Sequence, residues 1–380
     1  MIYQFDGGFS GVKKRADHVL IASVLLLTGL GMVSLYSASY GFSGRFFGDS
    51  YYLIFRQGIF AIFGLVLFFI GSWVDLEFIR LWIKPLVLGS ALLCVMTFVP
   101  GIGLTKNGAP RWIRIFSSSY QPSELVKLVL PLYLAHIFAK KEDRIDELGA
   151  AVLPPALVTM VFFFLIYRQN NFSTALFIAV NALVVFFLAG VRIRHLVSAL
   201  TLLLPFSVLF VLTREHRLRR LISFVWPAWE PLGAGYQVRS SVLTVASGAF
   251  WGRGIGHGIR KISSVPEVHS DFIFAAFAEE AGFLGVLLFW ALFIVFAVRG
   301  YRAALYSEDS FKRLLAGGLV TGIVSQALLN VAVVVGALPA TGIPLPFFSA
   351  GGSSQATTLL TAGFIVNVSR QSREEASGVE

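Results

Sequence analysis

Long apolar stretches without Asp, Glu, Lys or Arg recur along most of this chain. The last of them, 314–369, is divided by a segment rich in glycine and proline at 336–352. A helix needs roughly 20 mostly apolar residues to cross a bilayer. We therefore predict an all-α integral membrane protein with about ten transmembrane helices. The predicted spans are 18–39, 53–74, 81–100, 123–139, 149–167, 172–190, 195–213, 272–298, 314–338 and 347–369.

These spans form a single polytopic domain over residues 1–369, followed by a short cytoplasmic tail at 370–380. A long outer segment, 214–271, separates the seventh and eighth spans, and it shows no strong helical pattern. We interpret the first apolar run as an uncleaved transmembrane helix, because it is long enough to span and many more follow. The segment before the tenth span is expected to be broken.

Composition supports a membrane protein. Apolar residues make up 56% of the 380 residues, charged residues only 14%, and mean hydropathy is +0.76. A soluble domain carries about 25% charged residues, so a soluble or disordered protein is excluded. The one cysteine, Cys94, excludes an intramolecular disulfide and a cysteine metal cluster, and no dedicated metal-ligand set is expected.

The distribution of basic residues predicts the orientation. With the N-terminus in the cytoplasm, the inner segments hold 16 Lys and Arg residues and the short outer segments hold 6. Cytoplasmic loops are enriched in Lys and Arg. We therefore expect both termini inside and the functional face outside the cytoplasmic membrane.

Two charged residues fall near the start of the fourth predicted span. Glu124 and Lys127 lie three residues apart, so they share one helix face. One interpretation is an internal ion pair, which lowers the cost of both charges. The other is a carboxylate and an ammonium lining a polar cavity, since charges inside spans usually mark function. Pro122 and Ser123 fit the helix start, with Ser123 as a candidate cap.

A second acidic cluster lies where the long outer segment enters the eighth span. Asp271 could cap the helix or serve as a general base whose pKa rises at an apolar helix mouth. Glu279 and Glu280 follow two turns later. They are expected either to hold a neighbouring loop or to be buried and protonated.

The segment from Gly336 to Ser354 contains three prolines and four glycines, which forbid a continuous helix. Broken backbone at membrane depth is tolerated when it is buried in protein or lines a cavity. Gln326 and Asn330 share a helix face and could hydrogen-bond this segment. A structural break and direct ligand contact both remain open.

The outer segments are also basic and aromatic. In 111–116, basic and apolar residues alternate, which suggests an interfacial element lying on the bilayer. The arginines of 214–271 could attract lipid headgroups, or they could bind phosphate or diphosphate with bidentate donors. Nucleic acid is not expected as a partner on this face. The sequence Gly252-Arg253-Gly254-Ile255-Gly256 is not a dinucleotide fingerprint.

Several motifs together resemble the SEDS family of FtsW/RodA/SpoVE peptidoglycan glycosyltransferases, over nearly the whole chain. The matching motifs are Asn107-Gly108-Ala109 before Arg111-Trp112-Ile113, Gln121-Pro122-Ser123-Glu124 with Lys127, Gly235-Tyr236-Gln237, Pro266-Glu267 with His269 and Asp271-Phe272-Ile273-Phe274, and the run from Asn330 to Ser354. Arg219-Arg220 and Gly254-Ile255-Gly256 leading to Arg260-Lys261 favour the FtsW (division) branch. Thr341-Gly342-Ile343-Pro344 is more similar to the RodA branch, and we favour FtsW.

The chain departs from the family pattern at two places. After the fifth span, the usual Gln-Pro-Asp-Leu-Gly-Thr is replaced by Gln169-Asn170-Asn171-Phe172-Ser173-Thr174, so no functional acid is expected there. The tyrosine that usually precedes the double glycine is Ala350.

The resemblance implies polymerisation of lipid II with release of undecaprenyl diphosphate, at the outer face of the bacterial cytoplasmic membrane, for cell division or elongation. It implies catalytic roles for Asp271, as base or acceptor-positioning group, and for Glu124 and Lys127. Substrate contacts are expected from Arg111, Trp112, His269, Arg219, Arg253, Lys261, Gln121, Ser353 and Ser354. Mg²⁺ or Mn²⁺ held partly by substrate phosphates is expected, without an organic cofactor.

The resemblance also implies protein partners, namely a class B penicillin-binding protein acting as transpeptidase and other divisome or elongasome membrane proteins. Two alternatives to the enzyme remain. One is a lipid II flippase or transporter, since intramembrane charges and a broken helix are typical of transporters. The other is a non-catalytic scaffold of the wall-synthesis complex.

Overall fold

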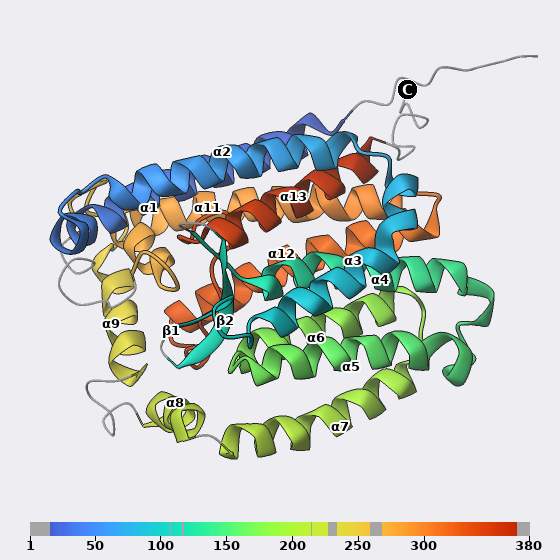
Figure 1. The fold of residues 1–380 in the computed structure, drawn as a ribbon. Helices are drawn as coiled ribbons and strands as arrows, with labels where there is room; N and C mark the ends of the chain where they lie inside the picture. Colours follow the sequence, from blue (N-terminus) through green and yellow to red (C-terminus); the bar gives the residue numbers. More distant parts are fainter. Residues whose placement is uncertain are drawn as a thin grey trace, which may run out of the picture.

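The computed structural model describes residues 16–106, 108–115, 118–213, 215–226, 234–258 and 268–370. Long helices pack side by side into one bundle (Figure 1). The membrane-length helices at the N-terminal side are α1 (His18–Phe47), α2 (Tyr52–Trp73), α3 (Leu76–Met96), α4 (Pro122–Lys140), α5 (Leu153–Arg168), α6 (Phe172–Leu188) and α7 (Ile193–Leu212). They are followed by α8 (Glu215–Val225), α9 (Ala234–Ser247), α11 (Ile273–Leu305), α12 (Ser310–Val334) and α13 (Gly352–Ser369). A 3-10 turn (Glu142–Arg144) and a π turn (Leu148–Val152) link α4 to α5.

The centre of the bundle is formed by α4, α12 and α13, whose side chains are mostly buried. α13 packs against α2, α1 against α11, and α12 against α4, α6 and α11. By contrast, α2 and α3 present large apolar side chains at the surface, such as Phe55 and Leu81. In the described residues, seven helices are long and apolar enough to cross a membrane. The fold is therefore that of a polytopic helical membrane protein.

Every predicted span overlaps a helix, but α1 and α11 run well past the predicted ends at 39 and 298, to Phe47 and Leu305. The last two helices are shorter at the broken segment, because α12 ends at Val334 and α13 begins only at Gly352. α6, α7 and α13 occupy predicted spans but are not among the seven that satisfy the length and hydropathy criteria. The exact count of ten spans stays a prediction.

The outer segments hold more regular structure than we expected. Segment 101–122 contains a three-stranded antiparallel sheet of β1 (Gly103–Lys106), β2 (Ala109–Ile115) and β3 (Ser118–Tyr120), in the order β1-β2-β3. The alternation in 111–116 therefore reflects the two-residue period of a strand, and the fold is not purely α. The segment 214–271, in which we saw no strong helical pattern, contains the helices α8 and α9. Both are short, and α9 is rich in Ser and Thr, which weakens its helical pattern.

Two predicted helix caps were wrong. α4 begins at Pro122 with Gln121 as its N-cap, so Ser123 lies inside the first turn. α11 begins at Ile273 with Phe272 as its N-cap, without a side-chain cap hydrogen bond. Asp271 is therefore one residue too early to cap the helix. Its carboxylate oxygen Oδ1 instead accepts a hydrogen bond from Ser270 Oγ.

Candidate active site

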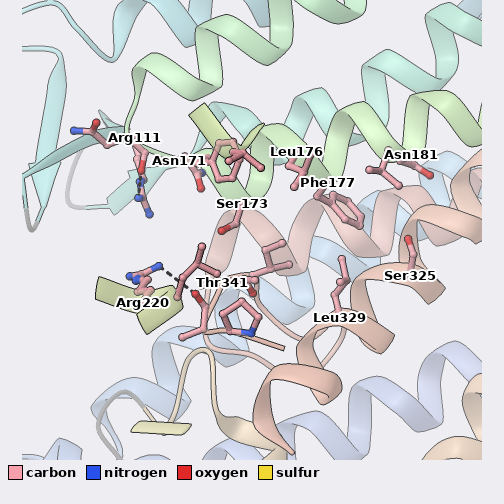
Figure 2. A pocket seen from close by; sticks show the side chains of 18 of the residues that line it. Arg111, Asn171, Ser173, Leu176, Phe177, Asn181, Arg220, Ser325, Leu329 and Thr341 are labelled. Carbon is pink, nitrogen blue, oxygen red and sulfur yellow. Dashed lines mark hydrogen bonds between the residues drawn. The ribbon is translucent and has the colours of Figure 1, made fainter. Parts of the chain in front are cut away.

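A cavity of about 510 Å³ lies between α6, α7, α8, α12 and the broken segment after α12. Its walls are mainly apolar, with Leu176, Phe177 and Leu329 among the lining side chains (Figure 2). Asn181 and Ser325 line the part remote from Arg111 and Arg220. The volume lies in the usual range for ligand sites. Such a cavity suits an amphiphile with a long apolar part.

Two arginines flank one end of this cavity, which we call the cavity mouth: Arg111 on β2 and Arg220 on α8 (Figure 2). The Arg111 guanidinium donates from Nη2 to the backbone oxygen of Asn170. Arg220 donates from Nη1 to the backbone oxygen of Ala340 at 3.4 Å. Thr341 lies on the same side. Two cations at the mouth of an apolar cavity favour an anionic headgroup, because guanidinium groups bind phosphate oxygens strongly.

Asp271 is not among the residues that line the cavity, but it lies next to the segment 339–343 that forms one of its walls. A Cβ added to Gly342 would be 3.4 Å from Asp271 Oδ2, so the carboxylate faces the space that a side chain at this position would occupy. Ser270 Oγ donates to Asp271 Oδ1 at 3.0 Å. Desolvation lowers the pKa of Arg220, and the nearby Asp271 carboxylate acts in the opposite direction. The carboxylate and the guanidinium are therefore within electrostatic reach of each other.

The broken segment is fixed by side chains of α12. Gln326 Nε2 donates to the Pro344 backbone oxygen at 2.8 Å. Asn330 Nδ2 donates at 2.8 Å to the backbone oxygens of both Ile343 and Asp271. The predicted contact between these two amides and the broken segment is thus confirmed. The segment is held in place by polar contacts inside the protein, as broken backbone at membrane depth requires.

Glu124 and Lys127 form the ion pair that was one of the two interpretations. Lys127 Nζ lies 2.8 Å from Glu124 Oε1 and donates to Gln326 Oε1 at 3.1 Å. Lys127 also lies over the ring of Phe177, 5.7 Å from its centroid. Both charged side chains are largely buried. Neither belongs to the lining of the 510 Å³ cavity, and Lys127 borders only a small void behind it.

Glu279 and Glu280 hold a neighbouring loop, as one of the two expectations proposed. Their backbone oxygens accept from the amides of Arg253 and Gly254 at 3.0 Å. Glu280 Oε1 also accepts from Gly256 N and from Ser37 Oγ on α1. Arg253 Nε lies 3.9 Å from Glu279 Oε1. Arg253 therefore packs against the α9–α11 junction and does not line the cavity.

The remaining predicted substrate contacts are scattered. Trp112 lies under Lys106 on the sheet, Gln121 donates to Ser123 Oγ, and His269 packs on Phe42. Arg219 is exposed and pairs with Glu215. Ser353 and Ser354 lie in the first turn of α13, and Lys261 lies outside the described residues. Of the predicted substrate-contacting residues that the structure describes, only Arg111 lines the cavity.

Sequence reasoning included Arg220 among the basic residues of 214–271 but not among the expected substrate contacts. It did not single out the pair Asn170 and Asn171, or Asn181, as lining residues. Arg220 directly follows the predicted Arg219 in the sequence. The two differ in the direction of their side chains, and of the two it is Arg220 that lines the cavity. Asn171 stands where the family motif usually has an acid, and the backbone oxygen of the preceding Asn170 accepts from Arg111. Asn181 is 6% exposed and interrupts the apolar run of α6, which was an available signal.

Within the described ranges, no group of three or more His, Cys, Asp or Glu side chains could hold a metal ion. A dedicated all-protein site for a divalent ion is not present there. A divalent ion at the mouth would therefore take most of its ligands from phosphate oxygens of the substrate.

Comparisons with known proteins agree with this architecture. The family model FTSW_RODA_SPOVE, described as "Cell cycle protein", matches residues 17–374. The chain is thus a polytopic membrane protein, and it belongs to the FtsW/RodA/SpoVE family. This confirms the resemblance found in the motifs.

Individual relatives cover nearly the whole chain. A protein named "Probable peptidoglycan glycosyltransferase FtsW" from Geobacter sp. (strain M18) is 36% identical over 95% of this chain and 98% of its own. Stage V sporulation protein E of Bacillus subtilis is 36% identical over 95% of this chain and 99% of its own. The relatives named FtsW agree with the favoured branch.

Solved structures share the fold. A chain from a peptidoglycan synthase complex that coordinates polymerization and crosslinking superposes with a TM-score of 0.76 at 30% identity, covering 95% of this chain and 99% of that chain. The rod shape determining protein RodA of Thermus thermophilus gives a TM-score of 0.68 at 27% identity, covering 95% and 98%.

Proposed function

We propose that this chain is a peptidoglycan glycosyltransferase that polymerises lipid II into glycan strands for cell division. The observation that carries the proposal is the Asp271 carboxylate next to the wall segment 339–343 of an apolar cavity whose mouth is flanked by two arginines. Relatives over the whole chain are named peptidoglycan glycosyltransferase FtsW. The enzyme is thus a membrane protein whose substrate is a lipid-linked sugar.

The cavity matches the parts of such a substrate. Its apolar walls along α6, α7 and α12 receive the first isoprene units of the undecaprenyl chain, which gains free energy by leaving water. Arg111 and Arg220 at the mouth bind the diphosphate. The sugar then lies outside the mouth, next to Asp271. The order of these groups along the cavity follows the order of the groups in the lipid.

Asp271 acts as the general base. Its carboxylate takes the proton from the 4-hydroxyl of one sugar as that oxygen attacks the anomeric carbon of the lipid-linked chain. The bond from that carbon to the diphosphate oxygen breaks, and undecaprenyl diphosphate leaves with the electron pair. The arginines stabilise the negative charge that develops on the leaving group. Direct attack gives inversion at the anomeric carbon.

A divalent ion, Mg²⁺ or Mn²⁺, fits this site as a partner of the diphosphate. It would neutralise charge on the leaving group. Such an ion would be held mainly by phosphate oxygens, because Asp271 must stay free of it to accept the proton. The positions of Arg111 and Arg220 at the mouth do not depend on it.

The reaction takes place on the outer face of the cytoplasmic membrane, with both termini inside. The basic residues of the inner segments support this orientation. A class B penicillin-binding protein, a transpeptidase, works with the enzyme in the divisome. The similarity to a chain of a peptidoglycan synthase complex supports such a partner.

The test is polymerisation of labelled lipid II by the purified full chain, alone and together with its transpeptidase, with and without Mg²⁺ or Mn²⁺. We expect a glycan ladder that resists an inhibitor of contaminating polymerases. The same preparation in liposomes is assayed for flipping of lipid II. Flipping of lipid II without a glycan ladder would show a transporter and contradict the glycosyltransferase. If the chain is required for growth and shows neither activity, it acts as a scaffold.

A further inference from the structure

Two buried amides on α12 connect the broken segment to the residue proposed as the base. Asn330, 2% exposed, donates from one nitrogen to the backbone oxygens of Asp271 and Ile343, both at 2.8 Å. Gln326, four residues earlier on the same helix face, donates to Pro344 O at 2.8 Å. One helix therefore holds both the backbone of Asp271 and the segment beside it.

Further hydrogen bonds join the same two stretches of chain. Ser349 Oγ donates to Ser270 O at 2.6 Å and accepts from Leu345 N at 2.7 Å. The backbone N–H of Ala350 donates to His269 O at 3.0 Å. Residues 269–271 and 343–350 are thereby fixed to each other, and the α12 amides fix both to the helix bundle.

The neighbouring face of α12 forms part of the cavity. Thr321, Ser325 and Leu329 recur every four residues and line it. Gln326 and Asn330 each follow one of these residues directly, so they project about 100° further around the helix. A single rigid helix thus sets the place of the cavity wall on one face and the place of Asp271 on the next.

The Glu124–Lys127 pair determines how the Gln326 amide is turned. Lys127 Nζ donates to Gln326 Oε1 at 3.1 Å, so the NH₂ end faces Pro344 O. The two ends of an amide are not equivalent, since one only accepts and the other only donates. A turned amide would place an oxygen against Pro344 O and NH₂ against the ammonium. The ion pair therefore excludes that orientation.

We infer that Gln326 and Asn330 are positioning residues for Asp271, and that the Glu124–Lys127 pair acts on the reaction through Gln326 rather than by touching the substrate. This inference rests on the proposed function. It assigns the two charges of α4 to the support of the site. It also explains why neither lines the 510 Å³ cavity.

The first test is Asn330→Asp, which keeps the shape and replaces the donor with an oxygen facing two carbonyls. The matched control is Asn367→Asp. Asn367 on α13 is likewise buried and donates to two backbone oxygens, Gly71 O at 2.9 Å and Val74 O at 2.6 Å. Both variants lose the same kind of bonds and should show similar drops in melting temperature.

Only Asn330→Asp should impair the chemistry. We expect its kcat for lipid II to fall at least ~10-fold, with KM changed by less than ~3-fold, since ~1.4 kcal/mol in the barrier is tenfold in rate. Asn367→Asp should keep kcat within ~2-fold. Equal kcat values for the two folded variants, or a change in KM alone for Asn330→Asp, would overturn the positioning role.

The second test asks how the ion pair acts. Glu124→Gln with Lys127→Met removes both charges together, which avoids leaving one buried charge without its partner. This double change is made in the wild-type chain and in Gln326→Leu. If the pair acts through Gln326, the double change lowers kcat in the wild-type chain. In Gln326→Leu, the same double change lowers kcat by less than a further ~2-fold. Full additivity would put Lys127 on the substrate and overturn that half of the inference.

Failure of this inference differs from failure of the proposed function. If wild type makes glycan and Asn330→Asp equals it, the positioning role falls and the glycosyltransferase stands. If folded wild type with its transpeptidase makes no glycan, the proposed function falls and takes this inference with it.

Discussion

At the scale of single residues, the direction of a side chain decides which charge belongs to the site. Arg219 and Arg220 are adjacent on α8, yet Arg219 is exposed and pairs with Glu215, whereas Arg220 lines the cavity. From the sequence we proposed Asp271, Arg111 and Arg219 as site residues. The structure brings Arg220 rather than Arg219 to the cavity, and a motif cannot separate the two, because neighbours on a helix differ by only about 100° in direction. That angle depends on how α8 packs.

These two arginines offer a matched pair of substitutions. Arg220→Ala should raise KM for lipid II at least ~10-fold, because a charge-assisted hydrogen bond contributes ~1.5–3 kcal/mol. Arg219→Ala should leave kcat and KM within ~2-fold, because an exposed ion pair contributes ~0–1 kcal/mol. Steady-state polymerisation kinetics measure both. Equal effects of the two changes would remove Arg220 from the site.

At the scale of elements, the breaks in the helices are as informative as the helices. The prolines and glycines of 336–352 predicted a broken segment, and Gln326 and Asn330 were correctly expected to bind it. The break inside α11 carried no such signal. Gly282 there has φ +64° and ψ −165°, and it packs against the loop held by Glu279 and Glu280. This contact joins segments 30 or so residues apart, so no local pattern reveals it.

Gly282→Ala should therefore destabilise the protein. An added Cβ would lie 2.1 Å from the backbone nitrogen of Gly252, in a left-handed conformation that alanine avoids. We expect a cost of at least ~3 kcal/mol, seen as a lower midpoint of thermal unfolding in detergent. Gly58→Ala in α2 is the control, since nothing lies within 4 Å of its added Cβ. It should melt at or slightly above wild type, and a Gly282→Ala protein that did the same would contradict this account.

At the scale of the whole molecule, hydropathy was sufficient to predict the helices of the bundle and insufficient to predict the sheet and the helices between the spans. Apolar runs located the helices, because a spanning helix must satisfy its own backbone and face lipid. The sheet β1–β3 and the helices α8 and α9 gather toward the end of the bundle opposite the C-terminus (Figure 1). They are too short and too polar to be found as spans by hydropathy, and the alternation in 111–116 was interpreted as an interfacial element rather than as a strand. Arg111 and Arg220 both come from this part.

The predicted orientation can be tested with single cysteines. Asp49 precedes α2 on the side predicted to be outer, and Glu308 lies between α11 and α12 on the side predicted to be inner; both residues are exposed. The native Cys94 is buried, so burial shields it from the labelling reagent. In intact spheroplasts, a membrane-impermeant maleimide should label Asp49→Cys and not Glu308→Cys until the cells are opened. The reverse pattern would invert the topology and place Asp271 in the cytoplasm.

The most direct test of the central claim is the initial rate of lipid II polymerisation by Asp271→Asn, measured beside wild type in the presence of the transpeptidase. The substitution keeps the size of the side chain and removes the base. The account predicts a rate at least ~100-fold below wild type, the usual contribution of a positioned general base, with unchanged folding. A folded Asp271→Asn protein that polymerises lipid II at the wild-type rate would contradict the account.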